Sequence, residues 1–357
     1  MNVTVHPDEL RRYGSAILSA AGLPEPDADV VAGSLVDANL RGTDSHGVSR
    51  IPIYVERIRR GIVEPHPQIR VISESGGALI VDGGNGMGAV VTSKAMEIAL
   101  DRLGKQRSIS VAIRNSNHYA SGSYYAKPAL ARGAATFLYS NAPATMSPWG
   151  GSRRFLGTNP YTFAIPAGRY GPLVLDMATS VVARGKIIQA AQRGESIPAG
   201  WAVDAEGRPT TDPQAALAGS VIPFGGPKGY GIAMMVEVMA GVLTGANIGP
   251  DVGDLYENLQ QPQNVGAFLQ VLDISAFLPH EQFVARVEEF IEALKATGTG
   301  SSEVLFPGEL EARNVEARRA RGITISPDVV AALAQVAPSG LPTPTGMENS
   351  DKSEEVS

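Results

Sequence analysis

The sequence predicts an α/β protein that begins with helices and continues with alternating strands and helices. Two observations carry this prediction. Apolar residues recur at helical spacing over residues 7–22 and 27–40. After Pro67, short apolar runs bounded by turn residues are typical of strands, and longer amphipathic runs between them indicate helices. The chain has 357 residues, so about two or three domains are expected.

The first helices lead into a short, polar connection. Asp27 or Asp29 is predicted to cap the second helix at its N-terminus. A third helix is expected over residues 51–58, because Pro52 is tolerated only in a first turn. His46 is therefore expected just before a helix N-terminus.

The remainder of the chain divides into further strands and helices. Strands are predicted over residues 69–72, 78–82, 108–113, 135–139, 161–165, 173–176 and 265–274, and helices over 90–103, 230–244, 281–296, 309–321 and 326–336. We expect the apolar helix 230–244 to be buried and the charged helix 309–321 to face solvent. The polar, Pro-rich stretch 338–357 is predicted to be disordered.

Composition excludes several classes of function. A net charge of −6 without a basic block argues against nucleic acid as a partner. No cysteine is present, and no histidine or carboxylate pair has metal-ligand spacing, so no metal site is expected. The sequence has no apolar run of about 18 residues and no signal-peptide pattern. We therefore expect no membrane partner and a cytoplasmic location.

The connection between the second and third helices, RGTDSHGVSR at residues 41–50, concentrates ionisable chemistry. A histidine exchanges protons near neutral pH. An arginine can hold a carboxylate with two hydrogen bonds. His46 and Arg50 together therefore indicate an enzyme that moves a proton while holding an acidic substrate.

A glycine-rich stretch at residues 84–89 formally fits a dinucleotide-binding fingerprint, since it follows a strand and precedes a helix. The next strand should then end in an acid that binds the ribose. It ends instead in Arg114 and Asn115. A glycine turn between strand and helix is the favoured interpretation.

Three further pieces have a functional and a structural interpretation. His118 follows a strand end, where α/β proteins bind ligands, but a lone histidine there is also often structural. Asp176 could orient a histidine, or it could cap the segment 181–192. Lys228, in a glycine-rich loop before a helix, could bind a phosphate or remain solvated.

Six motifs in this order resemble the malate/L-lactate dehydrogenase family, a non-Rossmann group. They are RGTDSHGVSR (41–50), NSNHY (115–119), TNP (158–160), DMATS (176–180), PKGYG (227–231) and FPGE (306–309). The resemblance covers roughly residues 5–330. It implies an L-sulfolactate dehydrogenase-like fold, in which a mixed sheet binds NAD or NADP beside a helical domain from both termini.

The resemblance also implies domains and an assembly. The helical domain would span residues 1–72 and 305–337, a small α/β domain 73–125, and the cofactor-binding domain 126–304. A homodimer, or a higher even oligomer, would place the active site close to the subunit interface.

Roles for individual residues follow from the same resemblance. His46 and His118 would be the proton donor or acceptor, with Asp176 in support. Substrate would contact Ser45, Arg50 and Tyr54. The matched cofactor positions are Ser140, Asp176, Met177, Ala178, Lys228, Pro307, Gly308 and Glu309.

The predicted reaction is reversible hydride transfer between a nicotinamide and the α-carbon of a small 2-hydroxy or 2-oxo acid. One alternative is reduction of a cyclic imine such as a piperideine- or pyrroline-2-carboxylate. A second alternative is a nucleotide-binding module without catalysis. The chain departs from the family's usual His-Phe-Gly at Tyr119 and Ala120, which leaves the substrate's identity open.

Overall fold

A seven-stranded mixed sheet runs through the centre of the computed structural model, which describes residues 2–300 and 302–347. In spatial order its strands are β2 (Arg70–Ser75), β3 (Ala78–Asp82), β4 (Ser108–Ser116), β11 (Val265–Asp273), β5 (Ala134–Ser140), β6 (Tyr161–Ile165) and β7 (Leu173–Met177). Strands β3 and β4 run parallel, and every other neighbouring pair is antiparallel. The predicted mixed sheet is confirmed.

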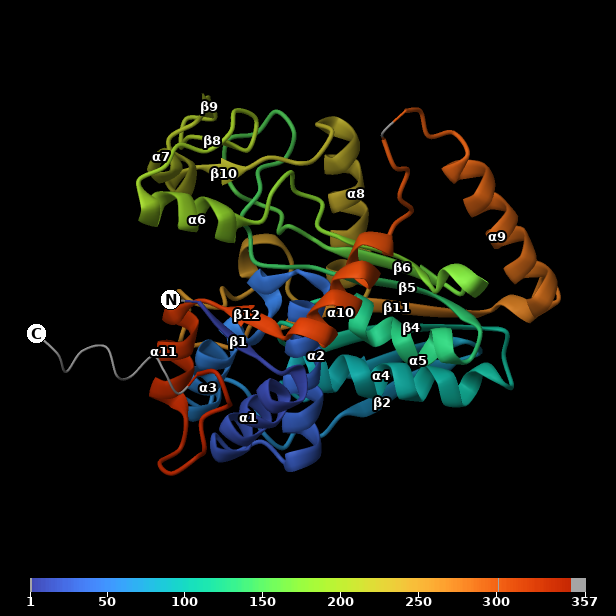
Figure 1. Ribbon diagram of the computed structural model, residues 1–357, viewed down its shortest axis with the longest axis horizontal. Coiled ribbons are helices and arrows are strands. Elements are labelled where there is room, and N and C mark those ends of the chain that lie inside the picture. The colour runs from blue at the N-terminus through green and yellow to red at the C-terminus, as the bar shows by residue number, and fades with distance from the viewer. Residues whose placement is uncertain (1, 301, 348–357) are drawn as a thin grey trace, which may run out of the picture.

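Strand β11 occupies the middle of this sheet because its residues are apolar on both faces. Val265, Ala267, Phe268, Leu269 and Val271 are all buried. Such a continuous apolar run is typical of a central strand. Helices α4 (Gly88–Leu103) and α5 (Ser123–Ala131) cover one face of the sheet (Figure 1).

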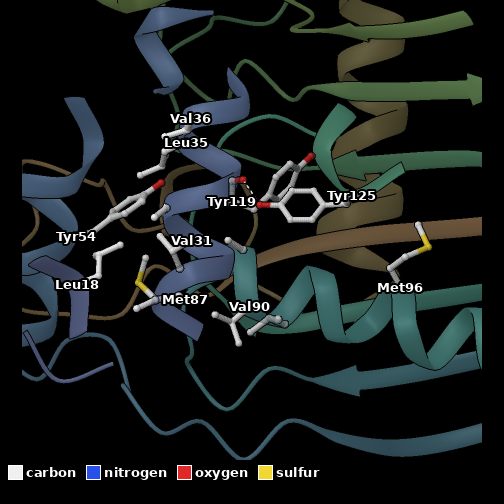
Figure 2. Packing of buried hydrophobic residues seen from close by; sticks show 14 of the residues in the cluster. Leu18, Val31, Leu35, Val36, Tyr54, Met87, Val90, Met96, Tyr119 and Tyr125 are labelled. Carbon is white, nitrogen blue, oxygen red and sulfur yellow. Dashed lines mark hydrogen bonds between the residues drawn. The ribbon is translucent and has the colours of Figure 1, made fainter. Parts of the chain in front are cut away.

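Helices from both ends of the chain pack together beside the sheet (Figure 1), as the resemblance implied. They are α1 (Pro7–Ala20), α2 (Glu25–Arg41), α3 (Ile51–Arg59), α10 (Glu309–Arg321) and α11 (Pro327–Val336). Strand β1 (Val3–Val5) pairs with β12 (Ile323–Ile325) and joins the two ends. Figure 2 shows the core beneath them, where Leu18, Val31 and Leu35 pack near Met87.

The predicted cap of α2 is wrong. The helix begins at Glu25, directly after Pro24, and has no side-chain cap. Asp27 lies within the first turn, where a negative charge is still favourable. The Asp29 carboxylate instead accepts two hydrogen bonds from Arg11 of α1.

The part of the chain between β7 and α8 forms a small, separate layer. It contains α6 (Arg184–Arg193), β8 (Ala202–Val203), β9 (Pro209–Thr210), α7 (Pro213–Ala218) and β10 (Ser220–Val221). Its three strands form a sheet of order β10-β8-β9 over an apolar cluster of its own. The strands are two residues long, which is too short for a pattern to predict them.

The main sheet crosses a predicted domain boundary. Strand β11 pairs with β4 on one side and β5 on the other. The strands of the predicted small domain 73–125 and of the predicted domain 126–304 therefore share one sheet. The division of the chain into domains stays a prediction.

The apolar helix predicted as buried is only partly covered. It is α8 (Pro227–Glu237), continued by a π-helical turn over Val238–Val242. One side packs on β11 and β5, but a run of large side chains is 43–58% exposed: Met234, Met235, Val238, Val242 and Leu243. The prediction of burial is therefore wrong for this outer face.

The other late helices follow the predictions. Helix α9 (His280–Lys295) matches the predicted 281–296, and α10 has no buried residue, as its charge pattern indicated. Single 3₁₀ turns lie at Gly168–Tyr170, Gly249–Asp251 and Ile274–Ala276. Over the described ranges, none of the helices has the length and apolar character needed to cross a membrane.

The predicted disordered tail begins too early. Leu341 packs against the helical core, and Met347 is 2% exposed within it. The Thr345 amide donates to Glu9 of α1. The prediction is wrong for residues 338–347, because a few apolar side chains among the prolines suffice to dock them. Its remainder falls on 348–357, which lie outside the described residues.

Candidate active site

The connection at residues 41–50 is folded around one buried amide. Helix α2 ends at Gly42, in a left-handed conformation, and two 3₁₀ turns over Asp44–His46 and Val48–Arg50 lead into α3. Asn39 accepts a hydrogen bond from the Val48 amide at 2.9 Å and donates to Asp44 at 2.7 Å. The contact with Asn39 leaves no room for a Cβ at Gly47.

Helix α10 holds the same connection from outside. Arg318 donates to the Asp44 carboxylate at 2.6 Å and to the Asn39 carbonyl at 2.5 Å. Asn314 donates to the Arg41 carbonyl at 3.1 Å. The turn that carries His46 is thus fixed by residues more than 270 positions further along the chain.

The two predicted histidines meet. The ring centroids of His46 and His118 are 5.7 Å apart, and both rings line one cavity. The Nδ1 atom of His46 lies 3.0 Å from the Ser45 hydroxyl, and that of His118 lies 2.7 Å from the Tyr54 hydroxyl. With Nδ1 engaged in each ring, Nε2 is the nitrogen available for other contacts.

His118 is positioned by the strand end and by the glycine-rich stretch. Its backbone amide donates to Gln263 at 3.1 Å. The preceding Asn117 donates to the carbonyls of Asn85 and Gly86. A Cβ at Gly88 would lie 1.9 Å from the Asn117 carbonyl oxygen, so only glycine fits. The stretch at 84–89 therefore packs against the His118 segment, which agrees with its interpretation as a structural turn.

Burial and charge keep both imidazoles neutral. Burial, and next the charge of Arg50, lower the pKa of His46 to about 4, against a smaller opposing effect of Asp176. Burial, Arg50 and then His46 lower the pKa of His118 well below its usual range. Near pH 7 each ring can therefore accept a proton.

Arg50 presents an unused charge beside the histidines. Its Nε donates to the Ser45 carbonyl at 2.8 Å, and the guanidinium lies 5.2 Å from the centroid of the Tyr256 ring. Among the described residues, no carboxylate pairs with it and its two terminal nitrogens have no partner. Burial raises the pKa of Tyr54, so that hydroxyl stays protonated beside the same cation.

Asp176 is held at the end of β7 by three donors. Its carboxylate accepts from the Ser121 hydroxyl at 2.6 Å, the Ser123 amide at 2.9 Å and Thr162 at 2.9 Å. Helix α6 begins beyond Ala183, so the alternative in which Asp176 caps that segment is wrong. None of its hydrogen bonds in the described structure reaches a histidine, and its charge alone acts on His46.

The predicted cofactor positions fall into two groups. Ser140 lines the cavity with the histidines, and its hydroxyl donates to the Asn141 carbonyl at 2.9 Å. Met177 and Ala178 follow Asp176 at the end of β7. The Pro307 carbonyl accepts from Val174 at 3.0 Å, and Gly308 packs on the same residue, so this pair lies along β7 as well.

Glu309 and Lys228 lie apart from the cavity lining. The Glu309 carboxylate is paired with Lys295 at 2.7 Å and with Arg313 at 2.6 Å. Lys228 lies exposed in the first turn of α8. Neither contact set identifies a ligand, so their cofactor roles stay predictions.

Sequence reasoning missed two residues that build the site. Asn39 lies inside a helix pattern, where an asparagine is unfavourable, and that mismatch was the available signal. Gln263 lies in a loop over residues 252–264 and gives no local signal. Arg57 holds that loop: it is 1% exposed and donates to the carbonyls of Asp254, Leu255, Asn258 and Gln261.

Comparison with known proteins agrees with this fold. The sequence matches malate/L-lactate dehydrogenase over residues 5–334. It is 38% identical to L-sulfolactate dehydrogenase of Methanothermobacter thermautotrophicus, over 93% of this chain and 96% of the relative. It is 34% identical to ureidoglycolate dehydrogenase (NAD⁺) of Escherichia coli K12, over 87% and 89%.

Solved structures give the same result. Sulfolactate dehydrogenase from Methanocaldococcus jannaschii superposes with a TM-score of 0.87 at 35% identity, covering 94% of this chain and 96% of that one. Δ1-piperideine-2-carboxylate reductase from Pseudomonas syringae gives 0.84 at 30% identity, covering 94% and 99%. The fold and the matches define an oxidoreductase of the dehydrogenase class. The chain belongs to the malate/L-lactate dehydrogenase family.

Proposed function

We propose that the protein catalyses reversible hydride transfer between NAD or NADP and the α-carbon of a small 2-hydroxy or 2-oxo acid. The observation that carries this proposal is the pair of neutral histidines, His46 and His118, facing one cavity beside the unpaired Arg50. Relatives named as sulfolactate, malate and ureidoglycolate dehydrogenases support it. One relative is named for NAD⁺ and another for NADP⁺, so either cofactor is proposed.

The lining of the cavity fits a flat nicotinamide ring. Besides the histidines, its lining includes the small or flat side chains of Ser140, Ala142, Pro143 and Pro160. Met177, Ala178, Lys228, Pro307, Gly308 and Glu309 are proposed to hold the rest of the cofactor, as the family motifs imply. When bound, the nicotinamide would accept the hydride in oxidation and return it in reduction.

Proton transfer is assigned to the histidines. In oxidation, a neutral imidazole takes the hydroxyl proton of the substrate, and the lowered pKa ensures that the ring is neutral near pH 7. In reduction, the imidazolium gives that proton to the forming alkoxide. Such acid–base catalysis contributes typically about 10²–10⁴-fold. Asp176 supports the protonated state of His46 through its charge.

Substrate binding is assigned to the connection before α3 and to α3 itself. The free terminal nitrogens of Arg50 suit a carboxylate held by two hydrogen bonds. Ser45 and Tyr54, each hydrogen-bonded to one histidine, would contact the substrate oxygen. This arrangement would hold the α-carbon of the substrate at a fixed place beside the nicotinamide, and such positioning of the reacting atoms lowers the barrier to reaction.

A homodimer is proposed from the exposed apolar face of α8. Five large side chains there, from Met234 to Leu243, are 43–58% exposed. A continuous apolar face of this kind is typical of a subunit contact. Light scattering should give twice the monomer mass, and Met235→Glu should reduce it. A monomeric wild-type protein would contradict the dimer.

The cytoplasmic location stays a prediction.

The test of the reaction is a substrate panel. The panel holds 2-oxo acids whose third carbon bears hydrogen, a carboxylate or a sulfonate, each with NADH and NADPH. We expect oxidation of one reduced cofactor with at least one acid, followed by its absorbance. Turnover of no acid with either cofactor would refute the proposal, and cofactor binding without turnover would favour a non-catalytic module.

A cyclic-imine reductase is the second candidate. The structural similarity to the piperideine-2-carboxylate reductase favours it. The carboxylate of a cyclic imine would suit Arg50 equally well, and a histidine could protonate the ring nitrogen. The same panel extended with cyclic imines separates the two reactions: a kcat/KM that is higher for the imine than for every oxo acid would replace the first proposal.

A further inference from the structure

The Tyr119 hydroxyl is a buried polar group without a partner. The residue is 4% exposed, and its hydroxyl oxygen forms no hydrogen bond with any described residue. Its ring packs edge-on against Tyr125 at 5.3 Å between centroids (Figure 2). The Tyr125 hydroxyl donates to the Tyr119 carbonyl at 2.5 Å, so that neighbour leaves the Tyr119 hydroxyl unsatisfied.

Tyr119 belongs to the lining of the active-site cavity. Tyr119 lines it together with His46, His118 and Ser140. The Ser140 hydroxyl and the Asp176 charge are the polar groups that act on the phenol. The Tyr119 hydroxyl therefore lies near the strand ends of β5 and β7.

In the described structure neither neighbour forms a hydrogen bond with the phenol oxygen. Ser140 donates its proton to the carbonyls of Asn141 at 2.9 Å and Gly266 at 3.2 Å. Asp176 already accepts three hydrogen bonds, from Ser121, Ser123 and Thr162. Burial, and next the Asp176 charge, raise the pKa of Tyr119, so the group stays protonated and is a donor. A buried donor without an acceptor is unfavourable, and a ligand that supplies the acceptor is stabilised in return.

We propose that Tyr119 donates a hydrogen bond to the carboxamide oxygen of the bound nicotinamide and so fixes the orientation of the ring. This inference rests on the proposed function. The carboxamide oxygen is the strong neutral acceptor of that ring, and it would lie at the Ser140 end of the cavity while C4 faces the histidines. Tyr119 is then a cofactor-binding residue that selects which face and edge of the ring meet the substrate.

The test is Tyr119→Phe, which removes one oxygen and keeps the packing. The dissociation constant of the reduced cofactor, measured by fluorescence titration, should rise on the order of tenfold. The unfolding temperature of the free protein should stay the same or rise, because the variant no longer buries an unsatisfied group. A thionicotinamide cofactor carries a sulfur, which is a poor acceptor, in place of the carboxamide oxygen. The wild type should bind it more weakly than the natural reduced cofactor, whereas Tyr119→Phe should bind the two cofactors equally.

Tyr125→Phe is the matched control. It removes a hydroxyl from the adjoining ring, but one whose hydrogen bond is internal to the protein. We expect a lower unfolding temperature and unchanged discrimination between the two cofactors. Wild-type cofactor affinity in Tyr119→Phe, or equal binding of the two cofactors by the wild type, would overturn the inference while leaving the proposed function intact. A wild-type protein that binds neither NADH nor NADPH overturns both.

Discussion

The two histidines reach one cavity from regions that are built in opposite ways. His46 lies on a connection held by side chains: Asn39, and Arg318 through Asp44. His118 lies just past the end of β4, where its backbone amide donates to the Gln263 side chain and the glycine-rich stretch approaches the backbone closely. We call these the helical half and the sheet half of the site.

This difference shows how each half fixes the position of its histidine. In the helical half, several polar side chains must all be present, and each can be removed singly. In the sheet half, the position of His118 depends mainly on strand register and on glycines that allow close backbone approach, with one side-chain contact from Gln263. The helical half should therefore be sensitive to single polar substitutions that the sheet half tolerates.

The largest expected effect comes from the histidines themselves. His46→Ala and His118→Ala should each lower kcat by about 10²–10⁴-fold, if both take part in proton transfer. Steady-state kinetics with the best substrate of the panel measures this, with thermal unfolding as the check on folding. If one variant alone loses turnover, the proton transfer belongs to that half. Wild-type kcat in both variants would refute the mechanism.

Arg50→Gln should produce the next largest effect. Loss of the carboxylate partner should raise KM by about 10–100-fold, as expected for a charged hydrogen bond of about 1.5–3 kcal/mol. The Arg50 charge lowers the pKa of both histidines, so the acid limb of the kcat/KM profile for oxidation should move to higher pH. The exposed Arg60→Gln, at the opposite end of α3, is the control. An unchanged limb in Arg50→Gln would contradict the charge effect.

The comparison of the two halves is tested most directly by a pair of variants. Asn39→Ala leaves the Val48 amide without its partner and removes one donor to Asp44, and it should cost about 1–3 kcal/mol of unfolding free energy, with a fall in kcat. Ser121→Ala removes one of three donors to Asp176 and should cost about 1 kcal/mol or less. Denaturant unfolding measures both. Equal costs would show that the two halves do not differ in this way.

The last expected effect is on stability at low pH. In the unfolded chain a histidine titrates near pH 6.5, whereas the pKa of folded His46 is about 4. The unfolded state therefore binds more protons between these values, so the stabilising contribution present above pH 6.5 is lost as the pH falls toward 4. The slope is at most about 1.4 kcal/mol per pH unit for one histidine. His46→Gln should reduce the slope of unfolding free energy against pH. An unchanged slope would show that His46 does not cause the loss of stability at low pH.

The sequence reveals the helical half better than the sheet half. The density of ionisable residues at 41–50 predicted His46 and Arg50 from chemistry alone, whereas His118 and Asp176 became convincing only through the family resemblance. The fold was predicted closely where elements are long, as in α1, α4 and β11. The sequence did not predict residues that act through tertiary contacts with distant parts of the chain, such as Gln263 and Arg318.

The exposed face of α8 shows another limit. Apolar composition predicts that a helix will be covered, but it does not say by which chain. Met235 and Val242 look like core residues in sequence and are exposed in the single chain. The same physical force can act within one chain or between two, and a pattern in one sequence cannot distinguish them.

The place of β11 in the sheet has a consequence for synthesis and folding. Its neighbours β4 and β5 come from residues 108–116 and 134–140, but β11 itself comes from 265–273. A nascent chain therefore carries two long apolar strand edges for well over a hundred residues before the strand that joins them emerges. Such late, non-local pairing slows folding and exposes edges that can associate with other chains. We expect refolding to be slow, and chains that end before residue 265 to aggregate.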